Sequence, residues 1–379
     1  MIKYNYLLLL LLFISLIGCR EKKTTTIDSF SLVKGDALSF ELDNRTRTLI
    51  GALFPYTDKD GTEYLTFQNQ GQNDLLFYNM NTQELAFKLQ PPYEGSNGVG
   101  DFIGYHIHNL DSLFLTVWGH RIVMIDRNLA IKDKYEYNMT HDSLPLARYH
   151  SMSSTPIYIL DNKLYIMPGG NRWADLAPVC ATIDLTDKSV KAFTSFTYPS
   201  FPGADNKMKR SSTEDEVSRM YNGEQFVYAF YYDEDIYLAS RDHSDIKRIK
   251  IKSRYIPKVK ILDDYGNVTP EGACANPNYG NMLYDPYRKV YYRVAYPEVE
   301  IEQGIKGMEL LSYGRKRFSI IIVDEAFQVI GETLFPDYIY NSRLMFVRED
   351  GLYISNSHYM NPAYSDDILS FDRFELVKN

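Results

Sequence analysis

The chain has 379 residues, with 41 Lys and Arg against 49 Asp and Glu and a formal net charge of −8 at pH 7. This balance argues against nucleic acid as a partner, because binding it usually needs a basic face. The 32 Tyr and 20 Phe favour β-sheet, and with only three cysteines the fold must be held together by packing.

The N-terminal segment has the features of an export signal. Lys3 precedes an apolar run over residues 6–17, which only Ser15 interrupts. This run is short for a membrane span, which needs about 20 apolar residues. Leu16-Ile17-Gly18-Cys19 resembles the bacterial lipobox, in which the cysteine becomes the lipidated first residue of the mature chain. We therefore expect a signal peptide over residues 1–18 and a lipid anchor at Cys19; an uncleaved anchor is the alternative.

Residues 19–29 read as the lipidated cysteine and a short polar tether, and residues 30–379 as one folded domain. We expect the protein in the bacterial cell envelope, on the outer membrane, touching the bilayer only through its lipid. The mainly basic run Arg20-Glu21-Lys22-Lys23 leaves the choice between the periplasmic and the surface face open.

A hairpin pattern recurs along the rest of the chain: an apolar strand, an Asp or Asn, a short turn and a second apolar strand. Asp and Asn suit the first corner because their side chains accept hydrogen bonds from turn amides. The spacing of the copies is comparable to the about 40–50 residues of a propeller blade plus loop insertions. The corner residues of the six copies are Asn79, Asp126, Asp184, Asp242, Asp324 and Asp372.

Two further strands are predicted upstream of most hairpins, which gives four strands per unit. They occupy residues 156–160 and 163–167, 279–284 and 289–296, and 343–347 and 351–355. The sequence therefore predicts an all-β fold, a six-bladed β-propeller with four antiparallel strands per blade, in which residues 37–42 add a closing strand to the last blade. Seven blades, a β-sandwich or a two-domain all-β protein are the alternatives, and residues 212–220 carry a weak helical signal.

The run EGSNGVGDFIGYHIHNLDSLFL (residues 94–115) is the most distinctive stretch of a wider likeness. Over nearly the whole mature length, the chain resembles bacterial lipoproteins that bear a six-bladed propeller domain of unknown function. That resemblance implies a fold and a location in the cell envelope, and it supplies no catalytic residues.

The predicted topology places the long connections on one face of the propeller, here called the long-loop face, and the tight turns on the other. The long stretches are residues 91–100, 140–151, 168–178, 198–223, 253–278, 297–316 and 355–367. Loops on a rigid scaffold often carry binding residues, and aromatic rings beside amides and charges suit a sugar or a peptide. Candidate ligand-binding residues there are Trp118, His120, Arg121, Tyr149, His150, Asn171, Arg172, Trp173, Asp175, Tyr279, Asn281, His358, Tyr359 and Asn361.

The sequence contains no recognisable catalytic, metal or cofactor motif. His106 and His108 share a predicted strand face without an evident third ligand, and a bridge between Cys180 and Cys274 stays open. We therefore expect no catalytic residue, metal or cofactor. The leading interpretation is a binding or scaffolding lipoprotein whose partner is a glycan, a peptide or an envelope protein. The alternative is a propeller-type polysaccharide hydrolase or lyase.

Overall fold

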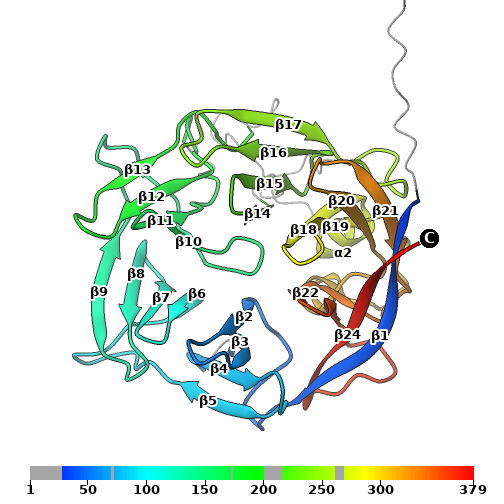
Figure 1. The fold of residues 1–379 in the computed structure, drawn as a ribbon, viewed down its shortest axis with the longest axis horizontal. Helices are drawn as coiled ribbons and strands as arrows, with labels where there is room; N and C mark the ends of the chain where they lie inside the picture. The colour runs from blue at the N-terminus through cyan, green and yellow to red at the C-terminus, as the bar shows by residue number, and fades with distance from the viewer. Residues whose placement is uncertain (1–27, 70–71, 172–173, 200–215, 261–268) are drawn as a thin grey trace, which may run out of the picture.

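The computed structural model describes residues 28–69, 72–171, 174–199, 216–260 and 269–379. Six four-stranded antiparallel sheets stand around a central axis, as Figure 1 shows. The predicted six-bladed β-propeller is confirmed, with six blades and not seven. The predicted signal peptide, Cys19 and nearly all of the tether lie outside the described residues.

Each blade runs from an inner strand at the axis to an outer strand at the rim. Blade 1 contains β2 (Leu53–Thr57), β3 (Glu63–Asn69), β4 (Asp74–Asn79) and β5 (Leu85–Leu89). Blade 2 contains β6 (Phe102–Asn109), β7 (Ser112–Val117), β8 (Arg121–Ile125) and β9 (Ile131–Glu136). Blade 3 contains β10 (Tyr158–Leu160), β11 (Lys163–Ile166), β12 (Ala181–Asp184) and β13 (Val190–Ala192).

The remaining blades follow the same order until the ring closes. Blade 4 contains β14 (Val217–Tyr221), β15 (Phe226–Phe230), β16 (Asp235–Ala239) and β17 (Ile246–Lys250). Blade 5 contains β18 (Asn278–Asp285), β19 (Val290–Tyr296), β20 (Ser319–Asp324) and β21 (Val329–Leu334). Blade 6 contains β22 (Asn341–Arg348), β23 (Gly351–Ser355), β24 (Ile368–Lys378) and, as its outer strand, β1 (Phe30–Glu41).

Five of the six predicted hairpins form, and their corner residues act as the sequence suggests. The Asn79 side chain accepts hydrogen bonds from the amides of Asn81 and Thr82, at 2.8 and 3.0 Å. Asp126, Asp184, Asp242 and Asp324 each accept a turn amide in the same way. These carboxylate and amide groups replace the backbone partners that the chain loses as it reverses.

The prediction of a sixth hairpin, around Asp372, is wrong. Asp372 lies inside the continuous strand β24, and its buried carboxylate accepts a hydrogen bond from the Tyr340 hydroxyl at 2.8 Å and pairs with Lys34 Nζ at 2.5 Å. Blade 6 takes its fourth strand from the other end of the chain, so β24 continues where the first five blades turn.

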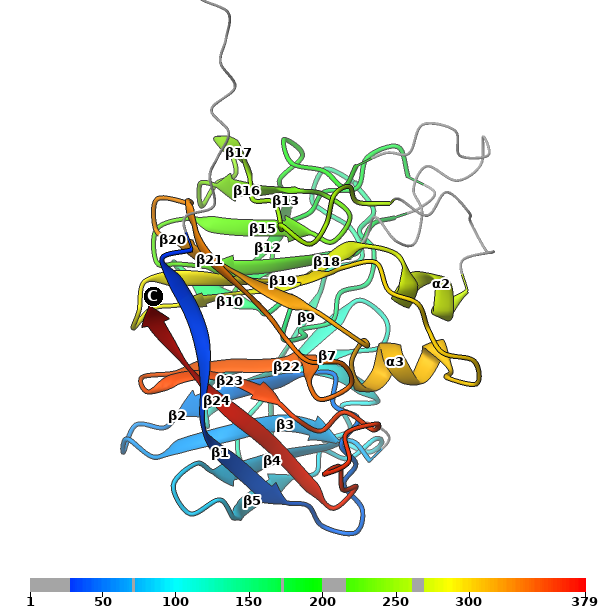
Figure 2. The ribbon, with the colours of Figure 1, turned by 90° about the vertical axis from the view of Figure 1, so that its right-hand side faces the viewer.

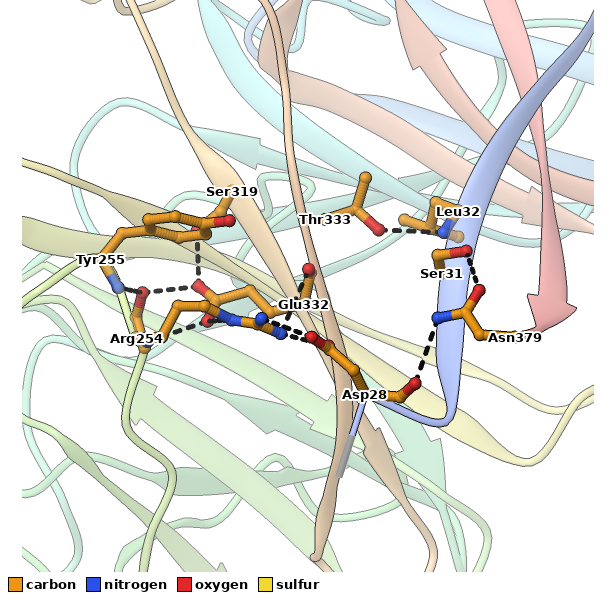
Figure 3. Close-up of polar contacts among 10 residues, drawn as sticks. Asp28, Ser31, Leu32, Arg254, Tyr255, Ser319, Glu332, Thr333 and Asn379 are labelled. Atoms are coloured by element: carbon orange, nitrogen blue, oxygen red, sulfur yellow. Dashed lines mark hydrogen bonds and ion pairs between the residues drawn. The ribbon is translucent and has the colours of Figure 1, made fainter. Parts of the chain in front are cut away.

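The N-terminal strand β1 closes the ring. It pairs antiparallel with β24 from Phe30 opposite Lys378 to Glu41 opposite Ile368, so the closing strand predicted at residues 37–42 is confirmed and begins earlier. Figure 3 shows how the start of β1 also reaches blade 5, where the Leu32 amide donates to Thr333 Oγ1 at 2.9 Å. Closure by distant parts of one chain removes an exposed sheet edge.

A second set of contacts in Figure 3 fastens the residue that precedes β1. Asp28 accepts a hydrogen bond from Arg254 at 2.6 Å, and the Arg254 amide donates to the buried Glu332 carboxylate at 2.8 Å. Glu332 also accepts from Ser319 Oγ at 2.6 Å. The chain is thus joined to the propeller body just before β1 begins.

The two faces of the propeller differ as predicted. Figure 2 shows α2 (Pro270–Ala275) and α3 (Gly307–Tyr313) on the face opposite the start of β1. Both helices lie in long connections. One part of the prediction is wrong, because Val217–Tyr221 forms inner strand β14 and neither a loop nor a helix. Pairing with β15 between two neighbouring blades outweighs the local capping signal, whose residues 212–215 lie outside the described ones.

Apolar side chains fill the space between neighbouring blades, and buried arginines tie some of them together. Arg219 of blade 4 donates to three carbonyl groups of blade 3, those of Pro156, Tyr165 and Ile166, at 2.5–3.2 Å. Cys180 and Cys274 are both buried, free thiols, so they do not form a bridge. Neither α2 nor α3 has the length and apolar character of a bilayer-spanning helix, in the part of the chain that is described.

Candidate functional site

Trp118 lies on the long-loop face, at the turn between β7 and β8, with its ring 56% exposed. It stacks on His150 with 5.7 Å between ring centroids, and the Arg148 guanidinium lies 4.3 Å from the Trp118 ring centroid. Burial and the nearby Arg148 charge lower the pKa of His150. The structure therefore brings two of the predicted residues together, at the long-loop end of blade 2.

The neighbouring candidates on blade 2 also point to local partners. His120 packs edge-on against Tyr137, and Arg121 pairs with Glu136 at 3.9 Å. On blade 3, Asn171 and Asp175 lie in the connection between β11 and β12, with Asp175 exposed. Arg172 and Trp173 lie outside the described residues.

Other candidates are enclosed within the propeller body. Tyr149 is buried and donates its hydroxyl to the Thr155 carbonyl oxygen at 2.6 Å. Tyr279 is buried beneath Arg293. His358 has no exposed surface, and burial lowers its pKa to about 4, so the ring is neutral at pH 7.

His358 organises the connection between β23 and β24. One ring nitrogen lies 2.9 Å from the Gly314 carbonyl oxygen, and Tyr359 stacks beside the ring. Asn361 donates its side-chain amide to the Asn356 carbonyl oxygen at 2.7 Å. These three side chains pack a loop and lie apart from the cluster around Trp118.

A cavity of about 280 Å³ lies at the axis, where the inner strands meet the long-loop face. Blades 4, 5 and 6 supply most of its polar side chains, and among the predicted residues that the structure describes only Asn281 lines it. The polar lining consists of Ser153, Ser154, Thr155, Glu216, Tyr231, Asn281, Tyr296, Arg315 and Arg343.

Two arginines line the cavity. Arg315 is buried, donates to Asn278 Oδ1 at 2.5 Å, and has its guanidinium 4.3 Å from the Tyr296 ring centroid. These contacts fix the plane of the guanidinium. Arg343 is exposed at the start of β22, and its guanidinium donates to the Leu311 carbonyl oxygen.

Glu216 supplies the opposite charge, directly before β14. Its side chain keeps contact with solvent in the cavity although protein surrounds it. Desolvation by this burial raises the pKa of Glu216, while the charges of Arg315 and Arg343 act to lower it. No hydrogen bond or ion pair engages its carboxylate among the described residues.

Hydrogen bonds link Tyr231, Asn281 and Arg343 along the wall of the cavity. The Tyr231 hydroxyl donates to Asn281 Oδ1, and the Asn281 amide donates to the Arg343 carbonyl oxygen at 3.3 Å. Burial and the nearby Glu216 charge raise the pKa of Tyr231, so its phenol stays protonated near neutral pH. The wall thus presents fixed donors and acceptors around an open space.

The segment after Tyr149 forms the floor of this cavity. Ser153 Oγ accepts a hydrogen bond from the Leu53 amide of blade 1 at 2.9 Å, and the Ser154 carbonyl oxygen accepts one from the Arg219 amide of blade 4 at 2.7 Å. Ser153 also lines a second, more aromatic cavity of about 570 Å³ around the inner strands. The segment therefore crosses the axis and separates a polar chamber from an apolar one.

The described lining of the polar cavity contains one carboxylate and two phenols that could take part in proton transfer. Glycoside hydrolysis usually needs two carboxyl groups about 5–9.5 Å apart, and Glu216 supplies the one carboxylate among the described residues that line the polar cavity. A protonated Tyr231 phenol is a poor base. In the described ranges, no three His, Cys, Asp or Glu side chains gather as a metal site would require.

Reasoning from the sequence missed Glu216, Tyr231, Arg315 and Arg343. Glu216 and Arg343 lie beside or within inner strands, Tyr231 directly follows β15, and Arg315 lies just after α3, whereas the sequence pattern favoured aromatic residues within long loops. Charged residues at the axial ends of inner strands would have been the useful signal.

Comparison with known proteins agrees with the fold. A crystal structure of a Bacteroides vulgatus family member has a TM-score of 0.78 and 24% sequence identity, covering 93% of this chain and 99% of that one. An exported protein from Bacteroides fragilis has a TM-score of 0.56 and 10% identity, with 92% and 96% covered. No curated protein matches the sequence. The model of the family described as "Domain of unknown function (DUF4221)" matches residues 29–334, and the chain therefore belongs to that family.

Proposed function

We propose that this protein is a membrane-tethered, extracytoplasmic binding lipoprotein, which recognises a glycan, a peptide or a partner protein on its long-loop face. The observation that carries the proposal is the polar axial cavity. In it the Glu216 carboxylate has no partner among the described residues, and the Arg343 guanidinium is exposed. A carboxylate without a protein partner and a guanidinium exposed in a cavity are suited to partners from outside the chain.

The proposed location rests on the N-terminal sequence. The apolar run and the lipobox-like Leu16-Ile17-Gly18-Cys19 support export and lipidation, and a protein of similar fold from Bacteroides fragilis is described as exported. Several acyl chains on one cysteine hold a protein firmly at a bilayer, because each buried CH₂ contributes about 0.8 kcal/mol.

The topology supports an orientation for the tethered protein. β1 begins beside the C-terminal end of β24, on the face opposite α2 and α3 (Figure 2). Glu216 and Arg343 lie at the starts of inner strands β14 and β22, which are their long-loop ends. A tether that ends at Asp28 would therefore hold the molecule by the face opposite the polar cavity. The cavity would open away from the membrane, towards ligands in the surrounding space.

Lipidation is tested by metabolic labelling of the full chain with a fatty-acid analogue, followed by membrane fractionation. We expect label and membrane association in the wild type and loss of both in Cys19→Ala. Cys274→Ala is the matched control. It removes a buried thiol and leaves Cys19 in place, so this variant should keep the label. Equal labelling of wild type and Cys19→Ala would refute the anchor.

Recognition is tested by applying a chain that starts at Arg20 to glycan and peptide arrays, since this chain keeps all six blades and the closing strand. We expect signals that weaken in Arg343→Ala. Arg317→Ala is the control, because Arg317 pairs with Asp337 in the same region and does not line the cavity. Signals that persist unchanged in Arg343→Ala would remove the cavity as the binding site.

A further inference from the structure

The polar cavity holds opposite charges apart. Arg315, Arg343 and Glu216 all contribute to its described lining, and the Glu216 carboxylate feels the charges of both arginines without forming a hydrogen bond to either. Protein around the Glu216 carboxylate removes part of its hydration, which is costly unless another group compensates the charge. A ligand that spans the gap would satisfy both groups at once.

The two arginines indicate which acidic group such a ligand would carry. Arg315 is held in one plane by Asn278 and Tyr296, and Arg343 presents an exposed guanidinium close to the same chamber. A planar guanidinium matches a carboxylate in geometry as well as in charge. Among the described lining residues, two arginines against a single Glu216 leave a net positive charge, which favours an anionic ligand.

The remaining polar groups define the other end. An ionised Glu216 accepts hydrogen bonds and donates none, so it prefers a hydroxyl or ammonium group. Ser154 and Tyr231 lie in the same lining and add polar atoms that suit hydroxyls.

Size sets a further limit. The chamber of about 280 Å³ is at the lower end of the about 300–1,000 Å³ typical of small-molecule sites, and the segment containing Ser153 closes it below. It therefore has room for one sugar ring or one amino-acid residue.

We propose that this cavity binds a small organic acid, with its carboxylate at Arg315 and Arg343 and its hydroxyl or ammonium donors at Glu216. This deepens the proposed function and rests on it for the location of the site. Two sources share the chemistry, a sugar acid and a free or terminal amino acid. Both carry a carboxylate and donors on one compact frame.

The test is isothermal titration of the chain starting at Arg20 with glucuronate and with glutamate, with glucose as the neutral comparison. We expect binding of at least one acid, none of glucose, and affinity that falls as salt is added. Arg343→Ala should weaken binding of the acid by about 10- to 100-fold, since a hydrogen bond to a charged group is lost. Arg317→Ala should leave the affinity unchanged.

The source is distinguished by Glu216→Gln. The neutral glutamine should weaken the binding of glutamate more than that of glucuronate. The ammonium group of glutamate needs a negative partner, whereas the hydroxyls of glucuronate can bind an amide. Equal affinity for glucose and glucuronate, or an Arg343→Ala variant that binds the acid normally, would overturn the inference. So would the absence of acid binding up to about 10 mM, a concentration that reveals millimolar dissociation constants.

The two proposals fail differently. If the arrays give signals that depend on Arg343 while neither acid binds, the ligand class is wrong and the binding function stands. If the arrays and the titrations both give nothing, the binding function fails together with the inference.

Discussion

The Arg293 guanidinium lies 3.8 Å from the ring centroid of Tyr279, deep between blades 4 and 5. Its other contacts are four carbonyl oxygens, those of Phe230, Asp233, Glu234 and Ile251, at 2.6–3.3 Å. Burial lowers the pKa of Arg293 to about 10, so it stays charged at neutral pH. One side chain of blade 5 thus satisfies the ends of strands and turns in blade 4.

We expect Arg293→Met to lower the free energy of unfolding by about 3 kcal/mol or more, because it leaves buried carbonyl groups without donors. Urea unfolding measures this as a lower midpoint with an unchanged slope. Arg317→Ala, which breaks an exposed ion pair with Asp337, should cost less than about 1 kcal/mol. Equal midpoints for the two variants would show that Arg293 does not join the blades.

Gly104 allows the floor of the polar cavity to approach blade 2. It has φ +86°, and a Cβ there would lie 2.3 Å from the Ser151 carbonyl oxygen. We expect Gly104→Ala to destabilise the protein by about 1–3 kcal/mol beyond the cost of the backbone angle alone. Gly61→Ala measures that angle alone, because Gly61 has the same φ of +86° with no atom within 4 Å. Similar thermal midpoints for both variants would contradict the close approach.

Glu216 should make stability depend on pH. Its pKa is raised in the fold, chiefly by burial and against the opposing charges of Arg315 and Arg343; Tyr231 and Tyr232 also lie near it. The stability linked to its protonated form is complete below the unfolded value of about 4.5 and is lost as pH rises through the raised value. We therefore expect Glu216→Gln to have a higher melting temperature than wild type at pH 7, with the difference shrinking towards pH 4. A variant that is less stable at pH 7 would contradict this.

Trp118 should matter little for the axial cavity. Its ring packs on His150 and Arg148 at the rim and does not line the cavity. We expect Trp118→Ala to leave acid affinity within about twofold of wild type and to lower stability by about 1 kcal/mol, through the lost stacking and cation–π contact. Titration and urea unfolding measure the two effects. A loss of affinity as large as that in Arg343→Ala would extend the site to the rim.

The blade pattern was predictable because hydrogen bonds between residues close in sequence determine the turns. Asn79 and Asp126 accept turn amides two to four residues further on, a signal that needs no knowledge of the tertiary fold. The same reasoning failed at Asp372. This aspartate lies in an apolar strand, where it pairs with Lys34 and accepts a hydrogen bond from Tyr340 and does not stabilise a turn. Which of the two roles an aspartate takes depends on a partner from the far end of the chain.

The site was harder to predict for a related reason. Glu216, Arg315 and Arg343 come from three consecutive blades and line one cavity only because these blades pack side by side around the axis. Aromatic residues in long loops gave a plausible alternative, yet Tyr279 proved to be buried under Arg293. Asn281 was found because amides beside aromatics were sought, and it does line the cavity.

A crystal structure of the chain starting at Arg20, grown with the acid that binds best in the titrations, tests the central claim most directly. We predict ligand density in the axial cavity, with a carboxylate at the Arg343 guanidinium and a hydroxyl or ammonium group at Glu216. Density above Trp118 or at the tight-turn face, with the axial cavity holding only water, would contradict the account.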